Sequence, residues 1–244
     1  MNATDWRMPD APLRASAVAT NLIGLVTVLA LAGVGRANLP LGDLYPLKAG
    51  ALFTAIMLLS MGFLQRHHPF ARFGSANQMT AVRAMIVALV ASLIGEPRFP
   101  SVAGAAVAAS VVVTMLDGVD GWLARRDRIT SDFGARFDME IDAFLIFALS
   151  LLAWRFQKAG GWVVLSGSLR YAFVAAGAVA PWLRAALPTS RRRQAICVIQ
   201  IAALSLAMVP AIQPPLSVLL AAAALATLSC SFLIDTLWLW RHAA

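Results

Sequence analysis

The feature that most constrains the fold is a series of long apolar runs, each of about 20 residues, that recurs along the whole chain. A helix of that length crosses the roughly 30 Å hydrocarbon core of a bilayer. Because backbone groups in lipid must be hydrogen-bonded within the protein, these runs are expected to be helical. The sequence therefore predicts an all-α, polytopic integral membrane protein.

The composition agrees with this prediction. The chain has 244 residues, of which 60% are hydrophobic and 13% are charged. Soluble domains average about 45–50% apolar and about 25% charged residues. We expect eight spans, near residues 16–35, 45–64, 76–95, 101–124, 135–154, 161–182, 194–212 and 216–239.

Eight spans would place the connecting segments alternately on the two sides of the membrane. Basic residues are distributed unequally between these two sides. With the N-terminus in the cytoplasm, the inner segments and their flanks hold thirteen arginines and the outer loops hold five basic residues. The positive-inside rule then predicts that both termini are cytoplasmic. The net charge of +8 is a topology signal. No nucleic-acid partner is expected, since no basic soluble face accompanies that charge.

The acidic residues are concentrated in one short stretch. Seven of the twelve lie between Asp117 and Asp142. Asp117 and Asp120 are three residues apart, and Asp138 and Asp142 are four apart, so each pair shares one helix face. A polar turn joins the two spans, which are therefore expected to be antiparallel neighbours. We predict that the four carboxylates converge near the cytoplasmic side.

Four converging carboxylates require cations or protons in a partly desolvated site. Hard oxygen ligands suit Mg²⁺, Mn²⁺ or Ca²⁺, and a pair of such ions can clamp a phosphoryl group. Gly118 and Gly121 leave room beside the acids for a substrate, and Gly134 allows close helix packing.

Two other interpretations of the acids remain open. The acids can be interfacial and paired with neighbouring arginines, which suits Asp127 and Asp132 in the turn but not the four acids inside spans, where charges are costly and mark function. Carboxylates between helices also build metal-cation transporters or channels. Such proteins tend to place polar groups near the midplane, whereas these acids lie near one cytoplasmic turn.

The acidic stretch resembles the motif of the CDP-alcohol phosphotransferases, integral membrane enzymes of phospholipid synthesis. It reads Asp117-x-x-Asp120-Gly121-x-x-Ala124-Arg125, then eight residues, then Gly134-x-x-x-Asp138-x-x-x-Asp142. A second match is Asn77-x-x-Thr80-x-x-Arg83, which is similar to the family's pattern at the start of its first core helix. The six spans from residue 75 onward resemble the family's six-helix catalytic core. Residues 1–74 would then hold a cytoplasmic segment and two accessory helices.

The resemblance implies roles for the motif residues. Asp117, Asp120 and Asp138 would bind two divalent ions, Mg²⁺ or Mn²⁺, with Asp142 on or near one of them and also acting as general base. The CDP part of the donor would be contacted by Asn77, Thr80, Gly121, Ala124, Arg125, Ser131 and Gly134. Arginine suits this role because its planar fork matches phosphate oxygens.

The implied reaction transfers the phosphatidyl group of CDP-diacylglycerol to a small alcohol or phospho-alcohol and releases CMP. The basic run Arg191, Arg192 and Arg193 lies in an inner loop and either binds an acceptor phosphate or serves topology and anionic lipid. The resemblance further implies a homodimer in a bacterial cytoplasmic (inner) membrane, with the active site on the cytoplasmic side. Two further charges inside spans, Arg170 and Asp235, are expected to pair with each other or to line the acceptor cavity.

Overall fold

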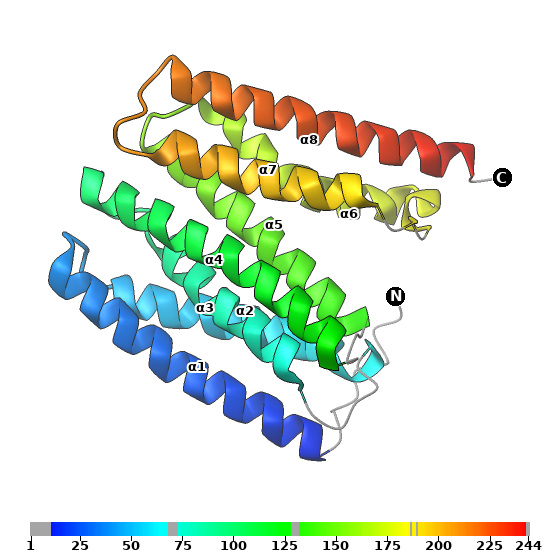
Figure 1. The fold of residues 1–244 in the computed structure, drawn as a ribbon, viewed down its shortest axis with the longest axis horizontal. Coiled ribbons are helices and arrows are strands. Elements are labelled where there is room, and N and C mark those ends of the chain that lie inside the picture. The colour runs from blue at the N-terminus through cyan, green and yellow to red at the C-terminus, as the bar shows by residue number, and fades with distance from the viewer. Residues whose placement is uncertain (1–10, 68–72, 128–131, 186, 189, 243–244) are drawn as a thin grey trace. The chain divides into compact units, whose positions relative to one another are not determined.

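The computed structural model describes residues 11–67, 73–127, 132–185, 187–188 and 190–242, and side chains within 15–60, 73–118 and 133–242 of these. The described residues form α-helices and two short 3₁₀ helices and contain no strand, which confirms the all-α prediction (Figure 1). The elements in chain order are α1 (Ala11–Asn38), α2 (Tyr45–His67), α3 (Ser75–Ser92), α4 (Pro100–Asp127), α5 (Asp132–Arg155), η1 (Gly161–Val164), α6 (Leu165–Val179), η2 (Pro181–Arg184), α7 (Arg191–Met208) and α8 (Leu216–Arg241).

Each of the eight expected spans coincides with one α-helix, the sixth with η1 and α6 together. Among the residues that the structure describes, four segments are long and apolar enough to cross a membrane: Ala15–Asn38, Pro100–Gly118, Gly161–Val179 and Leu216–Arg241. A shorter apolar segment of α2 covers Tyr45–Ser60. The remaining helices carry charges within their length, such as Arg83 in α3 and Asp142 in α5, which lower their hydropathy. The chain is therefore an integral membrane protein.

Contacts divide the chain into two compact units, and α4 and α5 contribute residues to both. The first unit comprises Met1–Val102 and Ala109–Asp142, and the second comprises Ala103–Ala108 and Ala143–Ala244. The boundary predicted between residues 74 and 75 separates accessory helices from a catalytic core, and this functional division stays a prediction.

In the first unit, α1, α2 and α3 pack against one another (Figure 1). A Cβ placed on Gly24 of α1 would lie 2.5 Å from the ring of Phe53 on α2, so the glycine permits close packing of the two helices. On α3, the buried face is formed mainly by small apolar residues, among them Ala84, Val87 and Ala88. The accessory helices α1 and α2 therefore cover α3 with closely packed apolar surface.

A buried carboxylate just beyond α3 contacts the loop between α1 and α2 and the start of α2. Glu96 accepts a hydrogen bond of 2.6 Å from the Gly42 backbone N–H and forms an ion pair with Lys48 at the start of α2. Nearby, the Tyr45 hydroxyl donates to the Leu89 carbonyl at 3.1 Å. Burial raises the pKa of Glu96, but the Gly42 and Lys48 contacts outweigh that effect and hold it below its ordinary value.

In the second unit, α7 and α8 lie side by side (Figure 1). The buried Lys158 donates to the carbonyls of Val209 and Ile212, at 3.1 and 2.5 Å, just beyond the C-terminus of α7. This places a cation where the helix dipole is negative, and burial lowers the pKa of that ammonium. A Cβ on Gly167 would lie 2.3 Å from the Phe147 backbone Cα, so α5 and α6 approach closely at this glycine.

We expect Glu96→Gln to lower the free energy of unfolding by about 1–3 kcal/mol at neutral pH, because it removes the charge from two hydrogen bonds. The folded-state pKa of Glu96 lies below its unfolded value, so its stabilisation is complete above the unfolded pKa and disappears as the pH falls through the folded pKa. Thermal unfolding in detergent, measured from neutral pH down to about pH 3, should show the two proteins converging in acid. A gap between wild type and variant that is constant across this range would contradict the assignment.

Candidate active site

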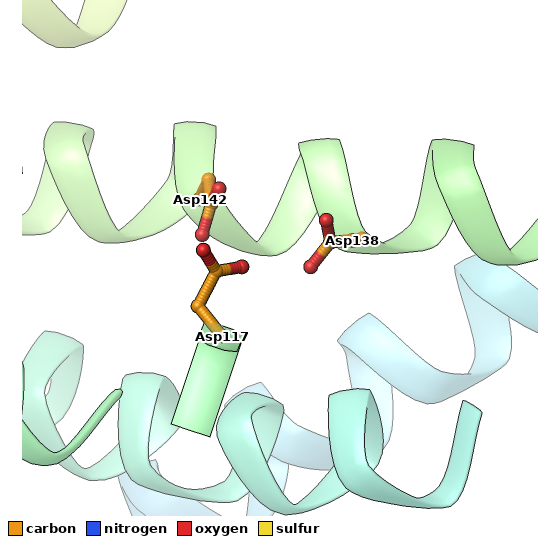
Figure 2. A group of neighbouring side chains, drawn as sticks. All are labelled: Asp117, Asp138 and Asp142. Carbon is orange, nitrogen blue, oxygen red and sulfur yellow. The ribbon is translucent and has the colours of Figure 1, made fainter. Parts of the chain in front are cut away.

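Three of the four predicted carboxylates come together in the first unit. One oxygen from each of Asp117, Asp138 and Asp142 lies within 4.8 Å of the others. Figure 2 shows Asp117 pointing from α4 toward the two aspartates of α5. Asp138 and Asp142 lie six and ten residues after the start of α5, or roughly 9 and 15 Å along its axis. The predicted convergence of these three acids is confirmed. On α5 it occurs about two to three turns after the start of the helix.

The carboxylates meet a buried cation that comes from α3. The Arg83 guanidinium lies 2.8 Å from an oxygen of Asp117 and forms ion pairs with Asp138 and Asp142. Its side chain has no exposed surface. Arginine can serve three acceptors because its planar fork carries five N–H donors. Arg83 therefore links α3, α4 and α5 at the site.

The acids are more accessible than the arginine that binds them. The exposed fractions of the side chains are 33% for Asp117, 37% for Asp138 and 16% for Asp142. The oxygens are thus held by a buried group on one side and reachable from the other. Three convergent carboxylates are the donor set that Mg²⁺ and Mn²⁺ prefer, so these residues fit a divalent ion.

The start of α3 is fixed beside this site by aromatic packing and a side-chain hydrogen bond. Phe73, just before α3, lies 6.0 Å from Phe133 of α5 between ring centroids, and Phe133 lies 5.7 Å from Phe137. The Asn77 amide donates to the Phe73 carbonyl at 2.6 Å. Thr80 is also buried, and its hydroxyl donates to the Ala76 carbonyl at 3.1 Å. Their predicted contacts with CDP stay predictions.

Several predicted donor-binding positions cannot be placed in the site. The side chains of Asp120, Gly121, Ala124 and Arg125 lie outside the described ones, although the backbone of α4 continues to Asp127. Ser131 lies outside the described residues altogether. Gly134 is half-buried in the first turn of α5. The predicted role of Asp120 as a metal ligand and the predicted roles of the other residues in binding the CDP group stay predictions.

The three arginines at the start of α7 have different surroundings, all within the second unit. Arg192 donates to the carbonyl and hydroxyl of Ser231 at 2.9 and 3.0 Å and forms an ion pair with Asp235 of α8. Arg193 lies 3.3 Å from the same carboxylate. Arg191 is exposed. Asp235 thus has two arginine partners on α7 that the sequence did not indicate, while its predicted pairing with Arg170 stays a prediction.

Sequence reasoning placed Arg83 in a donor-binding pattern but did not connect it with the acids. The signal that could have found this contact is the rarity of an arginine inside an apolar helix, since an intramembrane charge requires an opposite charge nearby. Arg83 stands eight residues after the start of α3. Asp138 and Asp142 lie at comparable distances from the start of α5. Matching these depths would have suggested the ion pairs.

Comparison with known protein families shows which family the sequence resembles. The sequence model of the family described as CDP-alcohol phosphatidyltransferase matches residues 73–232, about two thirds of the chain. The matched range includes Arg83 and the three convergent aspartates. Comparison with curated proteins gives no match. Comparison with solved structures gives none either.

We expect Arg192→Met to lower the free energy of unfolding by about 1–3 kcal/mol, because it removes the hydrogen bonds to Ser231 and one charge beside the buried Asp235. The matched control is Arg191→Met, which removes an exposed arginine one residue earlier and should change stability little. Thermal unfolding of both variants in the same detergent is the measurement. Equal losses in the two variants would contradict the assigned difference between these arginines.

Proposed function

The chain belongs to the CDP-alcohol phosphatidyltransferase family, and on this basis we propose that it transfers the phosphatidyl group of CDP-diacylglycerol to the hydroxyl of a small alcohol or phospho-alcohol. The other product is CMP. The observation that carries the proposal is the convergence of Asp117, Asp138 and Asp142 within the matched range. The family match also favours group transfer over the alternative, transport of a metal cation.

The proposed reaction breaks one phosphorus–oxygen bond and forms another. The acceptor hydroxyl oxygen attacks the lipid-side phosphorus of the diphosphate, the bridging bond breaks, and CMP leaves with the bridging oxygen. The hydroxyl proton passes to the carboxylate of Asp142. Of the three described carboxylates Asp142 is the least exposed, which suits a base that must act on a positioned hydroxyl rather than on bulk water.

The remaining acids would bind the cofactor. We propose that Asp117, Asp120 and Asp138, with Asp142 beside them, hold two divalent ions, Mg²⁺ or Mn²⁺. Such ions would supply the positive charge that stabilises the diphosphate and the departing CMP. The CDP group would be positioned so that its lipid-side phosphorus faces Asp142. The residues that would hold it are Asn77, Thr80, Gly121, Ala124, Arg125, Ser131 and Gly134.

A membrane-embedded site suits this substrate. The acyl chains of the donor can stay in the bilayer while the charged diphosphate reaches acids that lie roughly 9–15 Å from the start of α5. We propose that the acids face the cytoplasmic side of a bacterial inner membrane, as the positive-inside rule indicates, and that the protein acts as a homodimer.

The acceptor class depends on the arginines of α7. Arg192 and Arg193 share Asp235, so an acceptor phosphate would compete with that carboxylate for them. Arg191 is exposed and is the most accessible of the three for a phosphorylated acceptor. Candidate acceptors with a phosphate are inositol phosphate and glycerol 3-phosphate. Candidates without a phosphate are serine and choline.

We expect the purified protein to release CMP from CDP-diacylglycerol when Mn²⁺ or Mg²⁺ and one of these four acceptors are present. Asp142→Asn should lower that rate by a factor of about 100 or more, because the variant cannot accept the hydroxyl proton. The measurement is the initial rate of CMP formation at saturating donor.

The matched control is Asp43→Asn, which alters an exposed acid that pairs with Arg36 outside the site. Its rate should equal that of the wild type. An Asp142→Asn protein with full activity would remove Asp142 from the role of base.

A further inference from the structure

Arg83 binds the same three acids that are proposed to bind a divalent ion. Its guanidinium contacts Asp117, Asp138 and Asp142, the same three side chains that converge within 4.8 Å. The same three carboxylates form the possible ligand set of a metal ion. A guanidinium and a divalent ion would therefore share these carboxylates.

The surroundings of Arg83 hold it in this position. Its side chain is fully buried, and the α3 residues around it on the helix include Ala84, Val87 and Ala88, all without exposed surface. A long side chain in such packing cannot extend to water as exposed arginines do. The positive charge of Arg83 is thus a fixed property of the site.

The positive charge of Arg83 has two effects on the described carboxylates. Three carboxylates repel one another, and a guanidinium among them offsets part of that repulsion and keeps them together. The cluster then carries two net negative charges instead of three. A divalent ion is consequently attracted less strongly, and it is also repelled by the arginine at short range.

We propose that Arg83 is a positioning residue that acts as a built-in counter-cation: it holds the three carboxylates together and weakens their affinity for divalent ions. This inference rests on the proposed metal-dependent function of the same acids. A donor diphosphate adds negative charge to the site and offsets the weaker attraction for divalent ions that Arg83 causes. With Arg83 present, tight ion binding therefore depends on the donor. Arg83 thereby limits the binding of metal to the site before the lipid substrate arrives.

The test compares Mn²⁺ binding by the full-length protein in detergent, without donor, for wild type, Arg83→Met and Arg83→Lys. Calorimetry gives the affinity, and thermal unfolding gives the stability with and without Mn²⁺. Arg83→Met should unfold at a lower temperature without Mn²⁺ yet bind Mn²⁺ at least about tenfold more tightly, because the repelling charge is gone. Arg83→Lys keeps the charge and should stay within about threefold of the wild-type affinity.

The matched control is Lys48→Met, which removes a different buried ion pair in the same unit, that with Glu96. It should lower stability without changing the Mn²⁺ affinity, since a loss of packing alone does not tighten ion binding. Should Arg83→Met be too unstable for calorimetry, Mn²⁺ must raise its unfolding temperature in membranes by more than it raises that of the wild type.

The outcomes separate this inference from the proposed function. Equal Mn²⁺ affinities of the wild type and Arg83→Met would overturn the role of Arg83. They would leave the proposed metal-dependent reaction intact. Weaker binding by Arg83→Met would overturn that role as well. Absence of Mn²⁺ binding and of Mn²⁺ stabilisation in both proteins would instead overturn the metal-dependent function, and the inference with it.

Discussion

The ion cluster between Arg83 and three aspartates is the interaction on which the first unit of this membrane protein depends. Charges inside apolar helices are costly unless they are paired. Here one fully buried guanidinium binds carboxylates from α4 and α5. The cluster therefore fixes the position of α3 relative to the acids and, at the same time, brings together the groups proposed to carry out the chemistry. Stability and the proposed function would make opposite demands on these three carboxylates, since a metal ion at the proposed site would have to share them with Arg83.

The rest of the first unit holds α3 in place. The accessory helices α1 and α2 pack on α3, and polar contacts reinforce both of its ends. Glu96 joins the end of α3 to Gly42 and Lys48, and the Phe73 backbone N–H donates to Ser16 of α1 at 3.5 Å. We infer that α1 and α2 contribute to the site by fixing the helix that carries Arg83.

Much of this arrangement could be predicted from the sequence, because it follows from local patterns. Apolar runs of membrane-spanning length predict the helices, and the spacing of Asp138 and Asp142 places both on one face of α5. The few residues between these two spans predict that the spans are antiparallel neighbours, which places Asp117 opposite the two acids. The family match to residues 73–232 agrees with the resemblance that the acidic motif indicates.

The contacts that could not be predicted join residues far apart in the chain. Arg83 and Asp138 are separated by 55 positions, and Arg192 and Asp235 by 43. Helical periodicity assigns each residue a face but does not say which face of another helix it meets. Glu96 is a further example, because an acid in the turn between α3 and α4 has no local feature that identifies Lys48 as its partner. Such pairs depend on the packing of whole helices.

The most direct test of phosphatidyl transfer is to follow the oxygen of the acceptor hydroxyl. The active protein is given CDP-diacylglycerol, a divalent ion and an acceptor whose hydroxyl carries heavy oxygen, and both products are analysed by mass spectrometry. Attack by that hydroxyl on the lipid-side phosphorus predicts heavy oxygen in the phospholipid and unlabelled CMP. Heavy oxygen in a cytidine monophosphate ester of the acceptor, or CMP formed with phosphatidic acid and no labelled phospholipid, would contradict phosphatidyl transfer to an alcohol at this site.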